Sequence, residues 1–269
     1  MAPAPGREAA RVPVREVFAS IQGEGRYAGH PQVLVRLAGC PLRCRWCDTP
    51  DSWSAAPRAE ARIHTPRSSR TASAWASSPD VARWIAAVDP SGRRAVSVTG
   101  GEPLLWPSFL RELAARLGGR RLHLETAAPD PAVLAAVLDV ADHTSLDLKL
   151  PADLDPPVAV AEAEARAPAP RDAGEWAEVR IRNLGLLEGR DACGKIVVAG
   201  GRAPAEFAPL LDEVRTHLPE LPLFLQPATA VRGVAAPAPA LLDLLVTMAE
   251  ERGLNVRVVP QLHRVLGLA

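Results

Sequence analysis

Three of the four cysteines lie in one short stretch, Cys-Pro-Leu-Arg-Cys-Arg-Trp-Cys, at residues 40–47. The spacing CxxxCxxC lets three thiolates converge on one small object from a single loop. A structural zinc ion takes four protein ligands, and an ordinary iron-sulfur cluster takes four thiolates. The fourth cysteine, Cys193, is far along the chain in a segment expected to be a strand. A three-cysteine site therefore leaves one coordination position open for a small molecule.

Two other interpretations of this loop stay open from its spacing alone. A zinc ion could take a fourth ligand from His30 or His64. Cys44 and Cys47 also have the CxxC spacing of a redox pair. The segments around the loop must decide between these kinds of site.

The cysteine loop follows an apolar run, residues 32–39, that is rich in β-branched side chains and ends in glycine. This composition predicts a buried strand. The loop then lies at the carboxyl end of that strand, where open α/β sheets and barrels place their chemistry. Another strand is expected over residues 14–20. The glycine-rich segment 21–29 between the two is either a plain turn or a place where backbone approaches a ligand.

Strand and helix patterns alternate along the rest of the chain. A helix is expected to begin at Ser78-Pro79-Asp80, with apolar residues recurring at helical spacing as far as Val88. Further strands are expected over residues 95–98, 121–125, 145–149, 194–199, 223–226 and 255–259, and helices over 107–117, 131–140, 175–187, 204–218 and 238–251. This alternation, with right-handed crossovers, predicts an α/β fold: a partial, open parallel β/α barrel with about six core strands.

Domain organisation is expected to be simple. Residues 1–12 are predicted to be a disordered tail, and residues 13–269 a single domain. Proline makes up 27 of the 269 residues, about twice the usual share. Much of it lies in Ala/Pro-rich insertions near residues 55–77 and 150–174, which we expect to be surface segments, mobile or disordered, that carry no chemistry.

The charge balance gives no reason to expect a nucleic acid or a membrane surface as partner, because 31 basic residues face 31 acidic ones. No apolar run of about 18 residues occurs, and the first residues lack the order of a secretory signal. Clustered cysteines fit a reducing compartment better than a disulfide framework. A cytoplasmic protein is therefore expected.

A second candidate motif is Thr99-Gly100-Gly101-Glu102, at the carboxyl end of the strand expected over residues 95–98. It therefore lies on the same rim as the cysteine loop. Two adjacent glycines let the backbone bend and approach a ligand, and Glu102 offers an acceptor to an ammonium group. Taken alone, the motif is equally compatible with an ordinary strand-to-helix turn.

Together, the CxxxCxxC loop with Trp46 before its last cysteine and the downstream Gly-Gly-Glu resemble the radical S-adenosylmethionine (SAM) superfamily. The resemblance implies a four-iron, four-sulfur (4Fe-4S) cluster on Cys40, Cys44 and Cys47, whose fourth iron takes the amino and carboxylate groups of SAM. Gly100, Gly101 and Glu102 would help to hold the SAM amine. Other cofactor contacts are expected at the ends of successive strands, namely from Glu125, Thr126, Lys149 and Gln226.

A narrower resemblance is to the 7-carboxy-7-deazaguanine synthase family. It is carried by five separated motifs in order, which include EVFASIQGEGRYAGHPQVLVRLAGCPLRCRWCDT, KIVVAG, LQPAT and VVPQLHRVLG. The resemblance implies conversion of 6-carboxy-5,6,7,8-tetrahydropterin to 7-carboxy-7-deazaguanine with loss of ammonia. It also implies catalytic use of SAM, a need for Mg²⁺, flavodoxin or ferredoxin as electron donor, and a homodimer. Unlike the family, this chain lacks the glycine commonly found after the Glu125-Thr126 pair, because Ala127 and Ala128 follow it.

The same resemblance implies roles for individual residues. Arg36, Glu24 and His263 are the expected catalytic residues, with Arg36 pairing with the substrate carboxylate. Thr49 would give an oxygen to Mg²⁺. The expected substrate-binding set is Ile21, Gln22, Gly23, Glu24, Arg36, Thr99, Gln261 and His263, with Gln261 and His263 closing over the substrate.

Each of these assignments has a structural alternative: a structural ion pair for Arg36, a loop cap for Thr49 and a solvent-facing tail for His263. Asp147 and Lys149 could simply pair within the rim. His123 and Trp176 are expected in packing roles, and Cys193 as an inert buried thiol. Two other functions also remain: a radical SAM activase that forms a glycyl radical on a partner protein, and a zinc-stabilised binding module.

Overall fold

Parallel strands form the centre of the molecule in the computed structural model, which describes residues 10–55, 60–166, 168–231 and 233–268. Each of these strands pairs in parallel with the next one along the sheet. In order they are β2 (Pro31–Leu37), β7 (Ala95–Gly100), β8 (Leu122–Thr126), β9 (His143–Asp147), β11 (Ala192–Val198), β12 (Leu223–Pro227) and β13 (Val256–Val258). Apolar positions on these strands are almost fully buried, as at Val33, Val98 and Ile196.

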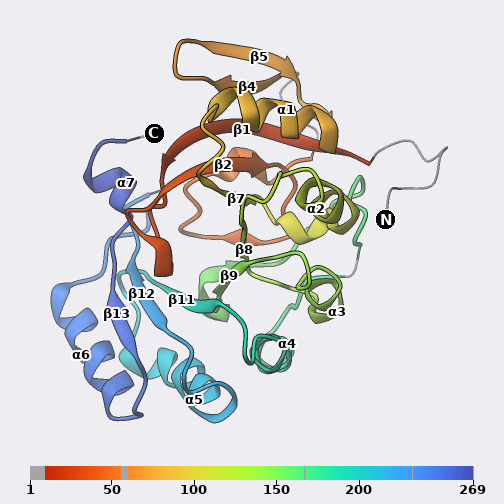
Figure 1. Cartoon of the computed structure of the whole chain (residues 1–269). Helices are drawn as coiled ribbons and strands as arrows, with labels where there is room; N and C mark the ends of the chain where they lie inside the picture. The colour runs from red at the N-terminus through yellow and green to blue at the C-terminus, as the bar shows by residue number, and fades with distance from the viewer. Residues whose placement is uncertain (1–9, 56–59, 167, 232, 269) are drawn as a thin grey trace.

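Helices follow one another along the outer side of this curved sheet (Figure 1). They are α1 (Ser78–Val88), α2 (Pro107–Ala114), α3 (Pro131–Ala135), α4 (Ala173–Leu186), α5 (Ala208–His217) and α6 (Pro239–Glu250), with the short α7 (Leu262–Val265) after the last strand. Helix α2 ends at Ala114, three residues before the predicted end at residue 117. Gly118 and Gly119 follow shortly after. Helix α1 is capped by Ser77 through a capping box with Asp80, one residue before the predicted start.

The sheet continues beyond β2 through antiparallel β1 (Arg11–Ile21), which pairs with β4 (Glu60–His64) and with β6 (Trp75–Ser77). Strand β5 (Ser69–Ser73) pairs with β4 and ends this side, while β13 ends the other. Since these two end strands do not pair with each other, the predicted open, mostly parallel α/β sheet is confirmed. The parallel part has seven strands in the described ranges, in agreement with the predicted number of about six.

Two expectations about irregular segments are wrong. Residues 1–9 of the predicted tail lie outside the described residues, but Arg11 and Val12 belong to β1, and Val12 is buried against β6. The segment 55–77 holds β4, β5 and β6, although residues 56–59 are not described. In β4 apolar residues alternate with polar ones, so that Ala61 and Ile63 face the core while Arg62 faces outward.

The segment 150–174 is also more ordered than predicted. It contains a 3-10 turn, η4 (Pro151–Asp153), and β10 (Leu154–Asp155), which pairs with β3 (Arg43–Cys44) inside the cysteine loop. Ala163 and Ala169 are buried in the core. Its Ala/Pro composition therefore does not make it a free surface loop, because small side chains pack closely against neighbouring elements.

Across the described ranges, no helix combines the length and apolar character needed to cross a membrane.

Candidate active site

One cavity lies at the carboxyl ends of the parallel strands. Every residue that the sequence analysis assigned to a site lines it: Ile21, Gln22, Gly23, Glu24, Arg36, Cys40, Cys44, Trp46, Cys47, Thr49, Thr99, Gly100, Gly101, Glu102, Glu125, Thr126, Lys149, Gln226, Gln261 and His263. These residues come from segments 21–24 and 261–263 and, between them, from the ends of β2, β7, β8, β9 and β12 and the loops that follow. The fold thus brings the cysteine loop and the proposed substrate-binding residues to the same space.

The cysteine loop packs tightly on its inner side. Cys40 and Cys44 are buried and share an apolar cluster with Trp176, while Cys47 is half-buried. Burial raises the pKa of the Cys40 thiol, and raises that of Cys44 to about 11 despite the nearby charge of Lys149. Both side chains are therefore protonated thiols in the metal-free protein, and binding to iron would displace the proton.

The two glycines of the Gly-Gly-Glu turn lie against the backbone that leads into the cysteine loop. A Cβ on Gly100 would come within 2.2 Å of the Leu37 carbonyl oxygen, and one on Gly101 within 2.0 Å of the Gly39 carbonyl oxygen. Backbone hydrogen bonds join Gly101 N to Leu37 O (3.1 Å) and Glu102 N to Gly39 O (2.8 Å). Both positions require glycine because a Cβ would collide with the neighbouring backbone segment. The turn thereby holds the start of the cysteine loop in place.

Glu102 is fully enclosed at this turn. Its carboxylate accepts hydrogen bonds from the backbone amides of Leu104 (3.0 Å) and Ala127 (3.0 Å) and from the Thr126 hydroxyl (2.5 Å). Burial raises the pKa of Glu102 to about 7, although these three donors oppose the rise. The acceptor expected for an ammonium group is thus engaged with the protein, and it links the Gly-Gly-Glu turn to the end of β8.

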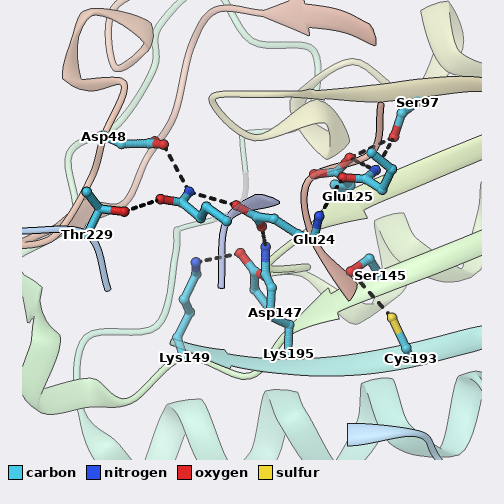
Figure 2. A network of polar contacts seen from close by, with 12 residues as sticks. Glu24, Asp48, Ser97, Glu125, Ser145, Asp147, Lys149, Cys193, Lys195 and Thr229 are labelled. Carbon is cyan, nitrogen blue, oxygen red and sulfur yellow. Dashed lines mark hydrogen bonds and ion pairs between the residues drawn. The ribbon is translucent and has the colours of Figure 1, made fainter. Parts of the chain in front are cut away.

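Opposite charges alternate across the floor of the cavity (Figure 2). Asp147 accepts from Lys149 (2.7 Å) and pairs with Lys195 (2.9 Å), and Lys195 also donates to Glu24. Burial opposes both ammonium charges, but Asp147 and Glu24 outweigh it and raise the pKa of Lys195. The Lys149 ammonium lies 4.6 Å from the centre of the Trp46 ring. The predicted Asp147–Lys149 pair is therefore present as part of a larger network.

The segment after β13 completes one wall. Gln261 Nε2 donates to Glu24 (2.8 Å) and Asp48 (3.2 Å), and its oxygen accepts from Thr229 (2.7 Å) (Figure 2). The His263 ring lies directly on Gly23, where any Cβ would collide with Nδ1 at 2.1 Å. His263 therefore faces the cavity, and the solvent-facing alternative does not hold.

The loop after β1 reaches both ends of the barrel. Gln22 points into the site, where its Nε2 donates to Glu125 (2.8 Å). The 3-10 turn η1 (Gly25–Tyr27) then runs to the amino-terminal ends of the strands. There the Tyr27 ring lies 4.5 Å from that of His123 and 4.7 Å from that of His143, and its hydroxyl donates to Asp191 (2.6 Å).

Arg36 lines the cavity and also forms an ion pair within the protein, from Nε to the Glu16 carboxylate at 2.8 Å. The predicted structural ion pair of Arg36 is thus present, and it uses one of the five guanidinium N–H donors. Arg36 also acts on Asp48: burial raises the pKa of Asp48, but Gln261, Arg36 and Arg264 outweigh it and hold that pKa below its ordinary value.

Sequence reasoning gave no site role to Asp48, Lys195 or Thr229, which all line the cavity. Lys195 carried the clearest signal. It is a single cation inside the apolar strand β11 and is buried, and such a cation must find an anion. Asp48 directly follows the last cysteine, and Thr229 ends the Leu-Gln-Pro-Ala-Thr motif.

Two buried polar atoms on the cavity have no hydrogen-bond partner among the described residues: Trp46 Nε1 and Gln226 Oε1. Buried polar groups are normally satisfied, so these atoms fit a polar ligand such as SAM beside the three thiols. Zinc fits less well. His64 bonds Ser69 at 2.9 Å and His30 contacts the Tyr27 ring, and neither lines this cavity.

Ala128 adopts a left-handed backbone conformation, with φ 44°, two residues after Thr126. This conformation costs a residue with a Cβ about 1 kcal/mol or more. We expect Ala128→Gly to raise the free energy of unfolding by up to about 1 kcal/mol, because the relief outweighs the greater freedom of glycine in the unfolded chain. Urea unfolding tests this. Ala127→Gly is the matched control and should destabilise; a destabilised Ala128→Gly would contradict the interpretation.

The comparison with known protein families agrees with this fold and site. The family model described as the radical SAM superfamily matches residues 34–167. An open parallel barrel with three cysteines on its cavity is the arrangement of a radical SAM enzyme, and membership of that superfamily implies a 4Fe-4S cluster and SAM.

Individual relatives show to which family within the radical SAM superfamily the chain is similar. The 7-carboxy-7-deazaguanine synthase of Methanothermobacter thermautotrophicus is 32% identical over 96% of this chain and 98% of that protein. The synthase of Geobacter sulfurreducens is 29% identical over 94% of this chain and 96% of that protein. The crystal structure of QueE from Escherichia coli shares the fold, with a TM-score of 0.53 at 22% identity over 94% of this chain and 95% of that one. The chain belongs to the 7-carboxy-7-deazaguanine synthase family, whose members are radical SAM enzymes of 7-deazapurine biosynthesis.

Proposed function

We propose that this enzyme converts 6-carboxy-5,6,7,8-tetrahydropterin to 7-carboxy-7-deazaguanine with loss of ammonia. The observation that carries the proposal is one cavity that joins the three cysteines to Gln22, Glu24 and Arg36. A glycyl-radical activase would share the cysteine loop and the Gly-Gly-Glu turn but would not need the Gln-Gly-Glu-Gly segment or the Pro-Gln-Leu-His segment. The family relatives also favour a small-molecule substrate.

The cofactors would be held in the part of the cavity next to the cysteine loop, which we call the inner half. Cys40, Cys44 and Cys47 would hold the cluster, and SAM would lie toward Trp46 and Gln226, two cavity-lining residues that each carry a buried polar atom without a partner among the described residues. When bound, this pair supplies a carbon-centred radical that can remove a hydrogen atom from the substrate. The buried Lys149 and the half-buried Asp147 place fixed charges beside this half, so little reorganisation of the protein would be needed there.

The substrate would be held in the part of the cavity lined by Glu24, Arg36 and His263, which we call the outer half. The Glu24 carboxylate accepts from Lys195 and Gln261 and can accept further N–H groups from the pterin edge. The free donors of Arg36 suit the substrate carboxylate. Thr49 would contribute an oxygen to Mg²⁺, whose shell substrate oxygens and water would complete. His263, held over Gly23, would cover the substrate and exclude water.

The reaction itself provides the direct test. Anaerobically reconstituted protein is incubated with the tetrahydropterin, SAM, Mg²⁺ and a reductant, and products are identified by mass spectrometry. Formation of 7-carboxy-7-deazaguanine supports the proposal, and SAM cleavage without this product contradicts it. We also propose flavodoxin or ferredoxin as electron donor and a homodimer in solution.

Arg36→Ala is expected to raise the KM for the tetrahydropterin by roughly 10- to 100-fold, with a smaller change in kcat. The reason is the loss of a charge-assisted hydrogen bond to the substrate carboxylate, worth about 1.5–3 kcal/mol. Steady-state kinetics at saturating SAM measures this. Arg62→Ala is the matched control, because Arg62 is exposed and lies 3.7 Å from the same Glu16. An unchanged KM in Arg36→Ala would assign Arg36 to a structural ion pair alone.

A further inference from the structure

The cysteine loop is held from its outer side by residues 151–158, which we call the clamp segment. Strand β10 pairs with β3, so that Leu154 stands opposite Cys44. Two more backbone bonds lie on either side of this pair: Arg45 N donates to Asp153 O (2.9 Å), and Val158 N donates to Pro41 O (2.9 Å). The clamp segment therefore contacts the loop beside its first cysteine and at its second.

The clamp segment is itself fastened to the barrel by Arg202. Asp153 is buried and accepts from Arg202 Nε at 2.7 Å, while Arg202 also donates to the Ala152 carbonyl at 2.6 Å. Arg202 precedes the 3-10 turn η5 (Pro204–Phe207) that leads into α5. A continuous chain of contacts thus runs from α5 through Arg202 and Asp153 to the cysteine loop.

Besides these bonds, Leu154 of the clamp segment packs against the apolar cluster that contains Cys40 and Cys44. β3 is two residues long, and the exposed pair of Arg45 with Asp155, at 3.0 Å, contributes little in solvent. A short loop held by a few hydrogen bonds opens locally when those bonds are lost, and the open form exposes whatever the loop encloses. The hydrogen bonds from the clamp segment therefore limit the fraction of time for which this side of the loop is open.

We propose that the clamp segment keeps the cysteine loop closed over its cluster, and that Asp153 and Val158 are positioning residues of the iron site. The segment does not touch iron or substrate. It limits the escape of iron by limiting loop opening. The inference rests on the cluster that the radical SAM superfamily implies, and not on the identity of the substrate.

The test measures cluster loss without turnover. Cluster-loaded protein is mixed anaerobically with excess chelator, and the decay of the visible absorption gives a rate. Val158→Pro removes the N–H that bonds Pro41 O, and Val158→Ala keeps it. Because one net hydrogen bond changes the open population about fivefold, Val158→Pro is expected to lose its cluster about fivefold faster than Val158→Ala.

A second pair of variants tests the fastening at Arg202. Asp153→Asn weakens the contact with Arg202 and is expected to speed cluster loss several-fold. Asp155→Ala, which removes only the exposed pair with Arg45, should match the unmodified protein. Thermal melting of the apoproteins separates loop opening from general instability.

Equal rates for Val158→Pro and Val158→Ala would overturn the proposal. It would also be overturned if the Val158→Pro apoprotein melted far below the Val158→Ala apoprotein, because the bond would then serve overall folding. Since no substrate is present, either outcome leaves the proposed reaction untouched.

Discussion

Cys44→Ala is expected to abolish cluster binding and to lower turnover by at least about a thousandfold, because groups that act as one unit fail together. Cys44 lines the cavity between Cys40 and Cys47 in the chain, so its loss leaves two thiols for the cluster. Iron analysis and the visible spectrum after anaerobic reconstitution measure the first effect, and product formation measures the second.

Cys193→Ala is the matched control for this variant. Cys193 is buried in β11, bonds Ser145 at 3.6 Å and does not line the cavity. Burial raises the pKa of its thiol, as expected of an inert residue. Its replacement should leave iron content and turnover near those of the unmodified protein. Full iron loading of Cys44→Ala, or loss of iron from Cys193→Ala, would contradict the assigned ligand set.

Gly101→Ala is expected to have the second largest effect. The new Cβ would lie 2.0 Å from the Gly39 carbonyl oxygen and 2.9 Å from that of Ser52, and both are backbone atoms. The Gly-Gly-Glu turn and the cysteine loop must then move apart. We expect the free energy of unfolding to fall by about 3 kcal/mol or more, and the apoprotein to accept little iron. Urea unfolding and iron analysis measure these two effects.

Gly185→Ala shows whether a glycine substitution is harmful in general. Gly185 lies in α4, where a Cβ would meet no atom within 4 Å. Alanine is the better helix former, so stability should rise by up to about 1 kcal/mol. If Gly101→Ala were as stable as Gly185→Ala and bound iron normally, the contact between the turn and the loop would not be as tight as described.

Sequence could predict the parts of the site that depend on local spacing. The cysteine loop and the Gly-Gly-Glu turn are short motifs, and each follows a strand with a clear apolar pattern. The lone cation in β11 signalled that Lys195 needs an anion, but which anion depends on register: β11 pairs with β9 so that Lys195 stands opposite Asp147. That alignment joins residues far apart in the chain, and no local pattern encodes it.

The predictions for the segments expected to be irregular failed for a different reason. In residues 60–64 the two-residue alternation was present, but the alanines and serines that follow gave little contrast, and Pro57 and Pro66 pointed to loops. The pairing of β10 with β3 was invisible because both strands are only two residues long. Short strands gain their stability from what they pack against, and composition does not report that.

The anchoring of Tyr27 affects how the enzyme can recognise its ligand. Gln22 and Glu24 sit on a stretch of chain whose far end is fixed among His123, His143 and Asp191, at the base of the barrel. Side chains on such a tethered stretch are already ordered before any ligand arrives, so little conformational entropy is lost on association. In the proposed reaction, Gln22 and Glu24 would therefore meet the substrate in an arrangement set before binding, and molecules of a different shape would lose these contacts.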